Sequence, residues 1–155
     1  MDQPHPEELL PALPGQRLQR GVARLLRQLD FAAVEEMPLA SGLRADLMAL
    51  GPKGEVWIVE CKSCRADFTS DRKWQGYAEY CDRFFWAVPA GFPETLLPAG
   101  DGLILADAWG GEVLRMPPAT PLAGARRKAV TQAFARTAAL RLNTLRDPQL
   151  DGTPR

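Results

Sequence analysis

The chain has 155 residues, of which 46% are hydrophobic and 25% charged, so it is long enough for one well-packed domain. The 19 basic and 19 acidic side chains cancel, which excludes the overall positive field of a high-affinity DNA-binding protein. The three cysteines do not make a structural zinc site, because such a site needs four ligands and the one histidine, His5, lies in a proline-rich segment. No stretch approaches the roughly 20 apolar residues of a membrane span.

Composition also bears on location and on the two ends of the chain. The acidic N-terminus lacks the apolar core of a signal peptide, and the cysteines are expected to be free thiols, so we expect a cytoplasmic protein. Residues 1–14 contain four prolines and are predicted to be a flexible arm, and residues 148–155 a flexible tail. Residues 15–147 are predicted to form one domain.

The first predicted elements are a helix over residues 16–29 and a strand over residues 31–39. Apolar residues of the helix form one stripe, which consists of Leu18, Val22, Leu25, Leu26 and Leu29. The helix has no acidic residue, and its basic residues are Arg17, Arg20, Arg24 and Arg27. Arginine pairs with phosphate in a bidentate fork, so this helix is a candidate nucleic-acid contact. The alternative is that these arginines have no nucleic-acid role and only reflect a genome of high GC content, which favours arginine over lysine.

A tight hairpin is predicted between residues 44–50 and 55–62. Pro52 fixes φ at the first turn position, and Gly54 takes the left-handed conformation that closes a three-residue loop. This loop length decides which residues lie opposite one another in the two strands.

The register brings two carboxylates together. A three-residue loop pairs Leu50 with Val56 and therefore places Asp46 opposite Glu60. Because side chains alternate along a strand, Lys62 projects to the same face as both acids. A two-residue loop would shift the register by one and move Asp46 to the other face.

Two carboxylates on opposed positions repel, since their Cβ atoms lie roughly 4.5–5.5 Å apart. A shared proton, pairing with Lys62 or Arg44, or a divalent cation would relieve the repulsion. Mg²⁺ is held by one or two carboxylates together with water and phosphate, and it lowers the pKa of a bound water. The pattern therefore predicts either a metal-dependent phosphodiesterase site or a structural ion-pair cluster on a half-exposed sheet.

The next segments alternate between helix and strand. Ser70 is predicted to cap a helix over residues 71–81, and residues 83–88 are predicted to be a closing strand. Residues 87–101 are rich in proline and glycine and are expected to form a surface loop. The predicted inner face of the helix consists of Trp74, Tyr77, Ala78 and Cys81.

The last part of the chain is predicted to extend the sheet and to cover it. Residues 103–106 and 113–116 form a second hairpin around Trp109, Gly110 and Gly111. Residues 122–145 form a long helix that packs on the sheet and leaves its arginines outward. Its packing side is predicted to consist of Ala129, Val130, Ala133, Phe134, Thr137, Ala138, Leu142 and Leu145.

Asp46 and Glu60-Cys61-Lys62, in their strand–turn–strand setting, resemble the motif of the PD-(D/E)XK nuclease superfamily. Longer stretches are similar to the MmcB-like DNA-repair family, over about residues 30–146. The resemblance implies an α/β, restriction-endonuclease-like fold with an α-β-β-β-α-β core, a mixed sheet, an added C-terminal hairpin and a long C-terminal helix. The similar stretches are residues 44–55, 66–74, 102–107 and 125–130.

The resemblance also implies roles for individual residues. Asp46, Glu60 and the backbone carbonyl of Cys61 would hold Mg²⁺ or Mn²⁺, and Lys62 would position or activate the attacking water. The family is expected to have a β-branched residue where this chain has Cys61, whose side chain should point away from the site.

The first helix departs from the superfamily, which often supplies a glutamate there. Glu36, in preference to Glu35, is our candidate for a substitute, and the alternative is ordinary charge at a strand edge. Lys73 and Gln75 are candidates for contacts to the scissile phosphate or the metal, and the alternative is a capped helix start. The candidate DNA-binding residues are Arg44, Lys73, Arg126, Arg127 and Lys128.

The leading hypothesis is a metal-dependent DNA endonuclease that acts in repair on branched, damaged or single-stranded DNA. The alternative is a protein of the same fold that binds DNA or a repair partner without cutting it. A small-molecule hydrolase is a third reading, for which the sequence has no pocket signature. The sequence leaves open whether the protein forms a homodimer.

Overall fold

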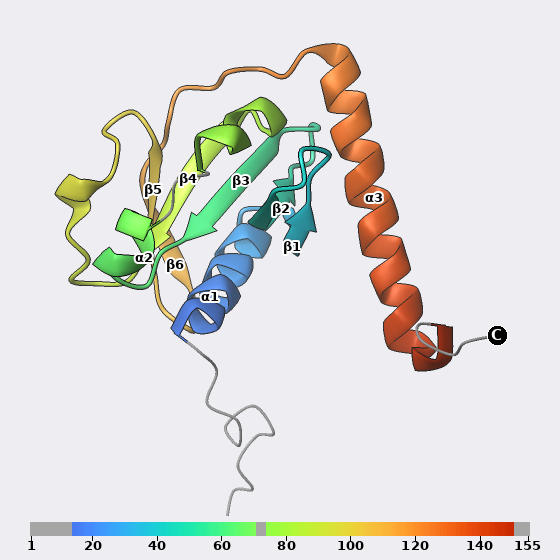
Figure 1. Cartoon of the computed structure of the whole chain (residues 1–155), viewed down its shortest axis with the longest axis horizontal. Helices are drawn as coiled ribbons and strands as arrows, with labels where there is room; N and C mark the ends of the chain where they lie inside the picture. The colour runs from blue at the N-terminus through green and yellow to red at the C-terminus, as the bar shows by residue number, and fades with distance from the viewer. Residues whose placement is uncertain (1–13, 71–73, 151–155) are drawn as a thin grey trace, which may run out of the picture.

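A computed structural model of the protein describes residues 14–70 and 74–150. It contains one six-stranded mixed sheet with the strands in sequence order (Figure 1). The elements are α1 (Pro14–Gln28), β1 (Ala32–Pro38), β2 (Arg44–Leu50), β3 (Val56–Cys61), α2 (Arg65–Ser70), η2 (Trp74–Tyr80), β4 (Arg83–Val88), η3 (Glu94–Leu96), β5 (Gly102–Ala106), β6 (Gly111–Arg115), α3 (Gly124–Arg146) and η4 (Pro148–Leu150).

Strand directions confirm the predicted topology. The strands β1, β2 and β3 are antiparallel neighbours, β3, β4 and β5 run parallel, and β6 returns antiparallel to β5. Parallel neighbours need a crossover connection, and α2 and η2 provide it between β3 and β4. The protein therefore has the expected α-β-β-β-α-β core, followed by the added hairpin and the long C-terminal helix.

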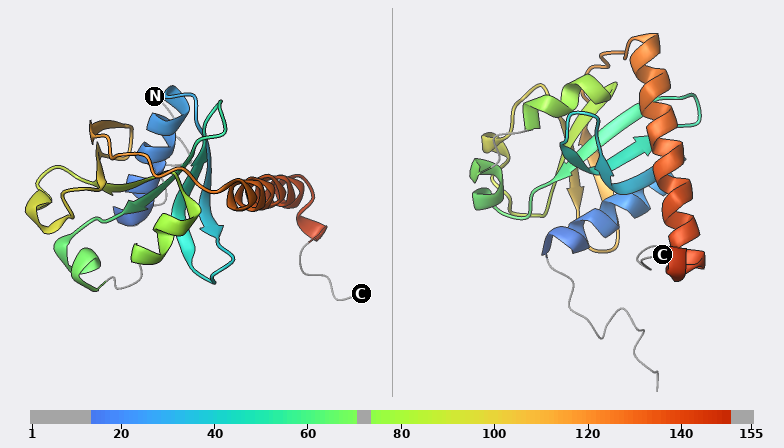
Figure 2. Two further views of the ribbon diagram at one scale, coloured as in Figure 1. Left: turned by 90° about the horizontal axis from the view of Figure 1, so that it is seen from above. Right: turned by 45° about the vertical axis from the view of Figure 1, so that its right-hand side comes forward.

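Helices cover both faces of the sheet (Figure 2). The apolar stripe of α1 packs on one face, where Leu26 and Val22 are buried with Leu47, Trp57 and Phe85. Leu29, which was predicted to continue the stripe, follows the end of α1 and is exposed. The opposite face is covered by η2 and by the first half of α3. Because both faces are covered, β3 is buried along its whole length, and polar side chains on it lie in a medium of low dielectric constant.

The predicted helix over residues 71–81 is wrong in type and in extent. Ser70 ends α2 instead of capping a helix, residues 71–73 lie outside the described part of the chain, and η2 is a 3₁₀ helix. Three residues per turn bring every third side chain to the same face, so the sheet buries Tyr77 and Tyr80 and leaves Ala78 exposed.

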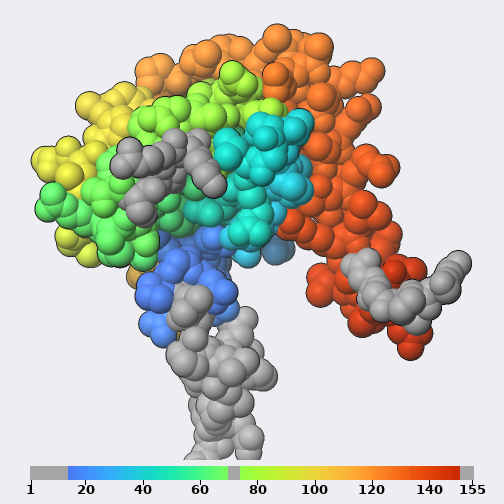
Figure 3. All heavy atoms as spheres, viewed as in Figure 1, coloured from blue at the N-terminus to red at the C-terminus, as the bar shows by residue number. Residues whose placement is uncertain are grey.

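The long helix packs only in part, and the prediction for it is corrected in both halves. Ala129 and Ala133 of the predicted packing side are exposed, and Arg127, which was predicted to point outward, is half-buried and pairs with Asp82. Val130 and Phe134 are buried against the sheet, whereas Leu142 and Leu145 are exposed. Figure 3 shows that this half of α3 stands apart from the rest of the surface. The helix is longer than the sheet face that it covers, so its apolar residues continue beyond the partner surface.

Two smaller predictions also need adjustment. Pro14, which was predicted to end a flexible arm, begins α1, because proline suits the first position of a helix. Residues 1–13 and 151–155 of the predicted arm and tail lie outside the described residues. The surface loop predicted over residues 87–101 is corrected as well, since residues 87 and 88 end β4 and the rest contains η3 and buries Phe92 and Leu97 against Trp86. Within the described residues, no helix is both long and apolar enough to cross a membrane.

Candidate active site

The hairpin between β2 and β3 has the predicted register. Leu50 pairs with Val56 and Met48 with Ile58, across a turn in which Gly54 has a φ of 87°. The Gly54 amide donates to the Gly51 carbonyl oxygen at 3.1 Å. The turn chemistry that the sequence indicated therefore sets the positions of the residues at the other end of the hairpin.

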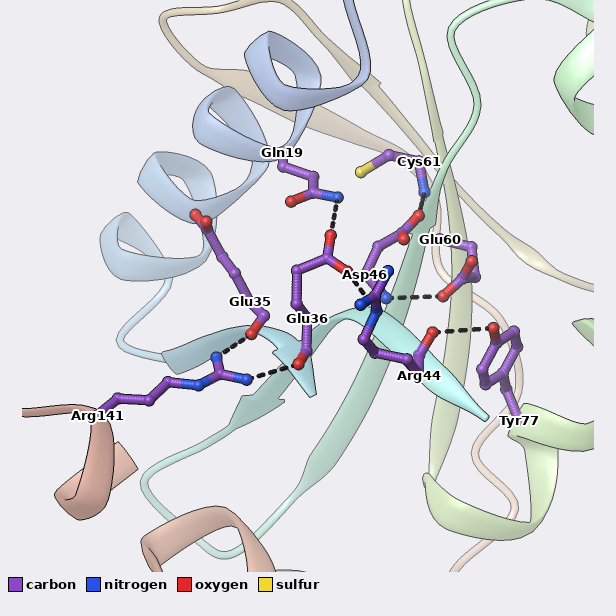
Figure 4. Close-up of polar contacts among 9 residues, drawn as sticks. All are labelled: Gln19, Glu35, Glu36, Arg44, Asp46, Glu60, Cys61, Tyr77 and Arg141. Atoms are coloured by element: carbon purple, nitrogen blue, oxygen red, sulfur yellow. Dashed lines mark hydrogen bonds and ion pairs between the residues drawn. The ribbon is translucent and has the colours of Figure 1, made fainter. Parts of the chain in front are cut away.

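At that other end the two strands part. The β2–β3 ladder stops at the pair Leu47 and Val59, after which β2 stays paired with β1 and β3 with β4. The Asp46 amide donates to Glu60 Oε1 at 2.9 Å, and the Cys61 amide donates to Asp46 Oδ2 at 2.8 Å (Figure 4). Each side-chain carboxylate thus accepts a hydrogen bond from a backbone amide of the opposite strand, where the ladder has stopped.

The two carboxyl groups are withdrawn from water to different extents, since Glu60 is buried and Asp46 is half-buried. Glu60 is only 3% exposed, and burial together with the charge of Asp46 raises its pKa to about 9. Burial is also the main cause that raises the pKa of Asp46, with a further contribution from the charge of Glu36. The amide hydrogen bonds and Lys62 favour the ionised forms but do not outweigh burial. At neutral pH the pair therefore retains a proton.

Glu36 lies beside this pair, on β1. Its backbone has a φ of 49°, a left-handed conformation that is costly for a residue with a side chain. Its carboxylate accepts a hydrogen bond from Gln19 Nε2 of α1 at 2.8 Å and forms an ion pair with Arg44 Nε at 2.7 Å. Glu36 therefore belongs to the cluster and is not an isolated charge at a strand edge.

The left-handed turn in β1 is held from the other side by α3. Arg141 donates to the carbonyl oxygens of Glu35 and Glu36, the latter at 2.6 Å. Figure 4 shows Gln19 reaching the cluster from α1 and Arg141 from α3. Neither Gln19 nor Arg141 was a sequence candidate, and no local pattern identifies either of them, because each acts on a residue that is distant in sequence.

Two further contacts fix the basic residues of the hairpin. The Arg44 side chain pairs with Glu36, and its carbonyl oxygen accepts a hydrogen bond from the Tyr77 hydroxyl at 3.1 Å. The Lys62 amide donates to the Ala87 carbonyl oxygen at 2.9 Å, which extends the pairing of β3 with β4. The half-buried Lys62 side chain lies close enough to both acids for its charge to favour their ionised forms, although burial still raises both pKa values.

The donor set suits a hard divalent cation. Carboxylate oxygens of Asp46 and Glu60 are the preferred ligands of Mg²⁺, which completes its shell with water and phosphate oxygens. Within residues 14–70 and 74–150, no three His, Cys, Asp or Glu side chains already converge as a ready-made metal site. The Cys61 thiol is buried on the α1 face with its pKa well above the usual range, mainly through burial, so it is not a candidate thiolate ligand.

The remaining predicted residues lie away from the cluster or have partners of their own. Lys73 lies outside the described residues, and Gln75 is exposed on η2. Arg127 is engaged by Asp82 at 2.6 Å and by the Gly54 carbonyl oxygen, and the Arg126 guanidinium stacks over the Tyr80 ring. The proposed DNA contacts of these residues and of exposed Lys128 remain predictions.

Comparison with known proteins gives a family. The structure superposes with a TM-score of 0.89 on the SPO1766 protein of unknown function from Silicibacter pomeroyi, with 58% sequence identity over 94% of this chain and 100% of that chain. Among curated proteins, none matches the chain. The sequence matches the family described as DNA repair protein MmcB-like over residues 13–149. The chain therefore belongs to the MmcB-like family of DNA repair proteins.

Proposed function

We propose that the protein is a metal-dependent DNA endonuclease that hydrolyses phosphodiester bonds during repair. The observation that carries the proposal is the pair of cross-bonded carboxylates, buried Glu60 and half-buried Asp46, at the point where β2 and β3 part. Burying two acids together is costly, and no packing advantage offsets the cost, since apolar residues would fill the same space. A divalent cation would remove the repulsion and convert this arrangement into a working site.

The roles of the side chains follow from their positions. Asp46 and Glu60 would hold Mg²⁺ or Mn²⁺, with the Cys61 carbonyl oxygen as a further ligand. The bound cation would lower the pKa of a water molecule and neutralise charge that develops on phosphorus. Lys62, which directly follows β3 and lies near both acids, would orient the attacking water or the phosphate as a point charge. Glu36 would accept a hydrogen bond from the water.

The remaining residues of the cluster would preorganise it. Gln19 and Arg44 hold the Glu36 carboxylate from two sides, and Arg141 holds the backbone that presents it. Residues that lock the rotamers of a site reduce the reorganisation that the reaction requires. The membership of a DNA repair family makes DNA the expected substrate.

The test is cleavage of a panel of DNA substrates (single-stranded, flapped, branched and nicked) with Mg²⁺ or Mn²⁺. The variants Asp46→Asn and Lys62→Met should abolish cleavage without unfolding the protein. Matched controls are Glu79→Gln, an exposed acid on η2, and Lys53→Met, an exposed lysine in the turn at the far end of the hairpin. Both controls should cut at the wild-type rate.

Binding of the metal alone is a second, independent measurement. Addition of Mg²⁺ or Mn²⁺ should raise the melting temperature of the wild type and of Lys53→Met but not that of Asp46→Asn. Wild-type protein that binds DNA, leaves every substrate intact and shows no metal-dependent stabilisation would contradict the nuclease proposal and favour a DNA-binding role without cleavage.

A further inference from the structure

A second surface with nucleic-acid chemistry lies on the outer side of α1. Its arginines follow one another at intervals of three and four residues, which places them along one stripe opposite the buried leucines. Exposed Arg17 and Arg24 and half-buried Arg20 belong to this stripe, and α1 contains no acidic residue. The stripe is therefore a local band of positive charge on a chain without net charge.

A tryptophan stands at the edge of this stripe. Trp109, in the turn between β5 and β6, is 70% exposed although it is one of the largest apolar side chains in the protein. The Arg24 guanidinium lies over its ring, 5.2 Å from the ring centroid. A cation on one face of the indole supports its orientation and leaves other parts of the ring open to solvent.

The turn that carries Trp109 is fixed in place. Asp107 Oδ1 accepts hydrogen bonds from the amides of Trp109 and Gly110, at 2.8 and 3.0 Å. The turn backbone lies directly against Gly21 of α1, where a Cβ atom would stand 1.7 Å from the Asp107 carbonyl oxygen. Trp109 is thus presented by a rigid support and not by a loose loop.

A pocket of about 680 Å³ lies between α1 and this turn. Its size falls within the roughly 300–1,000 Å³ of typical ligand pockets. Arg17, Leu18 and Ala90 contribute to its walls, and so does Ser63, the residue that directly follows Lys62. The pocket therefore connects the arginine stripe with the chain segment that leaves the candidate active site.

We propose that Arg17, Arg24, Trp109 and the adjoining pocket bind a segment of single-stranded DNA. Trp109 would stack on an unpaired base, and the arginines would pair with phosphates on either side. Glu112 also lines the pocket, and its negative charge favours a base or sugar there over a phosphate. The inference rests on the proposed function, because it identifies the part of the substrate that this surface would hold.

A single strand fits these features better than a duplex. A base stacks on an aromatic side chain only when its face is free of a neighbouring base, as in a gap, a flap or a single strand. The Trp109 side chain projects from a turn and offers such a platform, whereas a duplex would present only its backbone to it.

The experiment measures the binding of a labelled oligothymidylate by fluorescence anisotropy in EDTA, with all variants made in the Asp46→Asn background so that no cleavage occurs. Trp109→Ala should raise Kd about 5- to 150-fold, the factor expected for one lost stacking contact. Trp109→Phe should bind within about threefold of the parent. Melting temperatures verify that the exposed substitutions leave the fold intact.

The arginines are tested through salt dependence. Arg17→Gln with Arg24→Gln should lower the slope of log K against log salt concentration by about 1.4, since each phosphate contact on a single strand contributes about 0.7. Arg136→Gln, an exposed arginine on α3, is the matched control and should leave the slope unchanged. A blunt duplex of the same length should show no loss with Trp109→Ala.

Unchanged single-strand binding by Trp109→Ala, or equal losses on single strand and duplex, would overturn the inference. The two proposals fail in different ways. A wild-type protein that cuts no DNA but loses single-strand binding with Trp109→Ala retains this surface and lacks the nuclease activity. A protein that cuts DNA and is unaffected by Trp109→Ala retains the activity and lacks this surface.

Discussion

Glu60→Gln should stabilise the metal-free protein, and increasingly so as the pH rises. The substitution removes an ionisable group but keeps the shape of the side chain and an oxygen that can accept the Asp46 amide hydrogen. In the folded protein, burial and the charge of Asp46 raise the pKa of Glu60 to about 9 from its ordinary value of 4.5. A raised pKa gives stability that is complete below about pH 4.5 and is lost as the pH rises towards 9, because only the unfolded chain ionises freely in that range.

The magnitude follows from the shift. Between pH 4.5 and 7.5 the wild type loses up to about 4 kcal/mol in its free energy of unfolding, at about 1.4 kcal/mol per pH unit. Asp46 shares the proton, and the new amide group needs an acceptor, so we expect a net gain of about 2 kcal/mol for Glu60→Gln at pH 7.5. In a domain of this size that corresponds to a rise of about 4–8 °C in melting temperature.

The assay is urea unfolding of both proteins in EDTA at intervals between pH 5 and 8.5. Their free energies of unfolding should lie close together at pH 5 and diverge steadily above it, and the exposed control Glu79→Gln should follow the wild type throughout. Mg²⁺ should narrow the gap at high pH, because it binds the ionised wild-type pair. Parallel pH profiles of wild type and Glu60→Gln would refute the burial of a protonated carboxyl group.

Three further predictions concern positions that support the fold or the candidate active site. Asp82→Asn should lower the free energy of unfolding by about 3 kcal/mol in urea titrations, because it removes the carboxylate partner of Arg127. Partial burial opposes ionisation of Asp82, but its hydrogen bonds hold the pKa at about 2, so the difference should vanish as the pH falls from about 4 towards 2. Gly21→Ala should destabilise the protein by about 2 kcal/mol or more by forcing the turn at Asp107 away from α1, with the loss visible in thermal unfolding. Arg141→Ala should reduce cleavage about tenfold at nearly unchanged melting temperature, because the exposed guanidinium orders β1 and contributes little to the core.

Local turn chemistry explains why the hairpin could be predicted from the sequence. Pro52 and Gly54 restrict the loop to one length, and that length fixes every opposed pair of β2 and β3. Strand β4 could be predicted equally well, because its run of aromatic and apolar residues has no competing helical periodicity. These parts of the fold are encoded within a few residues of where they are observed.

The errors have non-local causes. The apolar spacing at Trp74 and Tyr77 fits an α-helix and a 3₁₀ helix equally well, and packing on the sheet selects the latter. The apolar side of α3 is visible in the sequence, but the sequence does not show where the sheet beneath it ends. The left-handed backbone of Glu36 has no sequence signal, since it depends on Arg141, 105 positions further along the chain.

The point where β2 and β3 part links the structural and the chemical roles of Asp46 and Glu60. Each carboxylate accepts a hydrogen bond from an amide of the opposite strand, and its oxygens retain further lone pairs, so a cation can bind without breaking these bonds. Burial keeps a proton on the pair, whereas the amides and Lys62 favour its loss. A cation has to displace that proton, so the apparent affinity for Mg²⁺ should rise with pH up to the pKa of about 9 and then level off. A structural ion-pair cluster would show no such metal-linked release of protons.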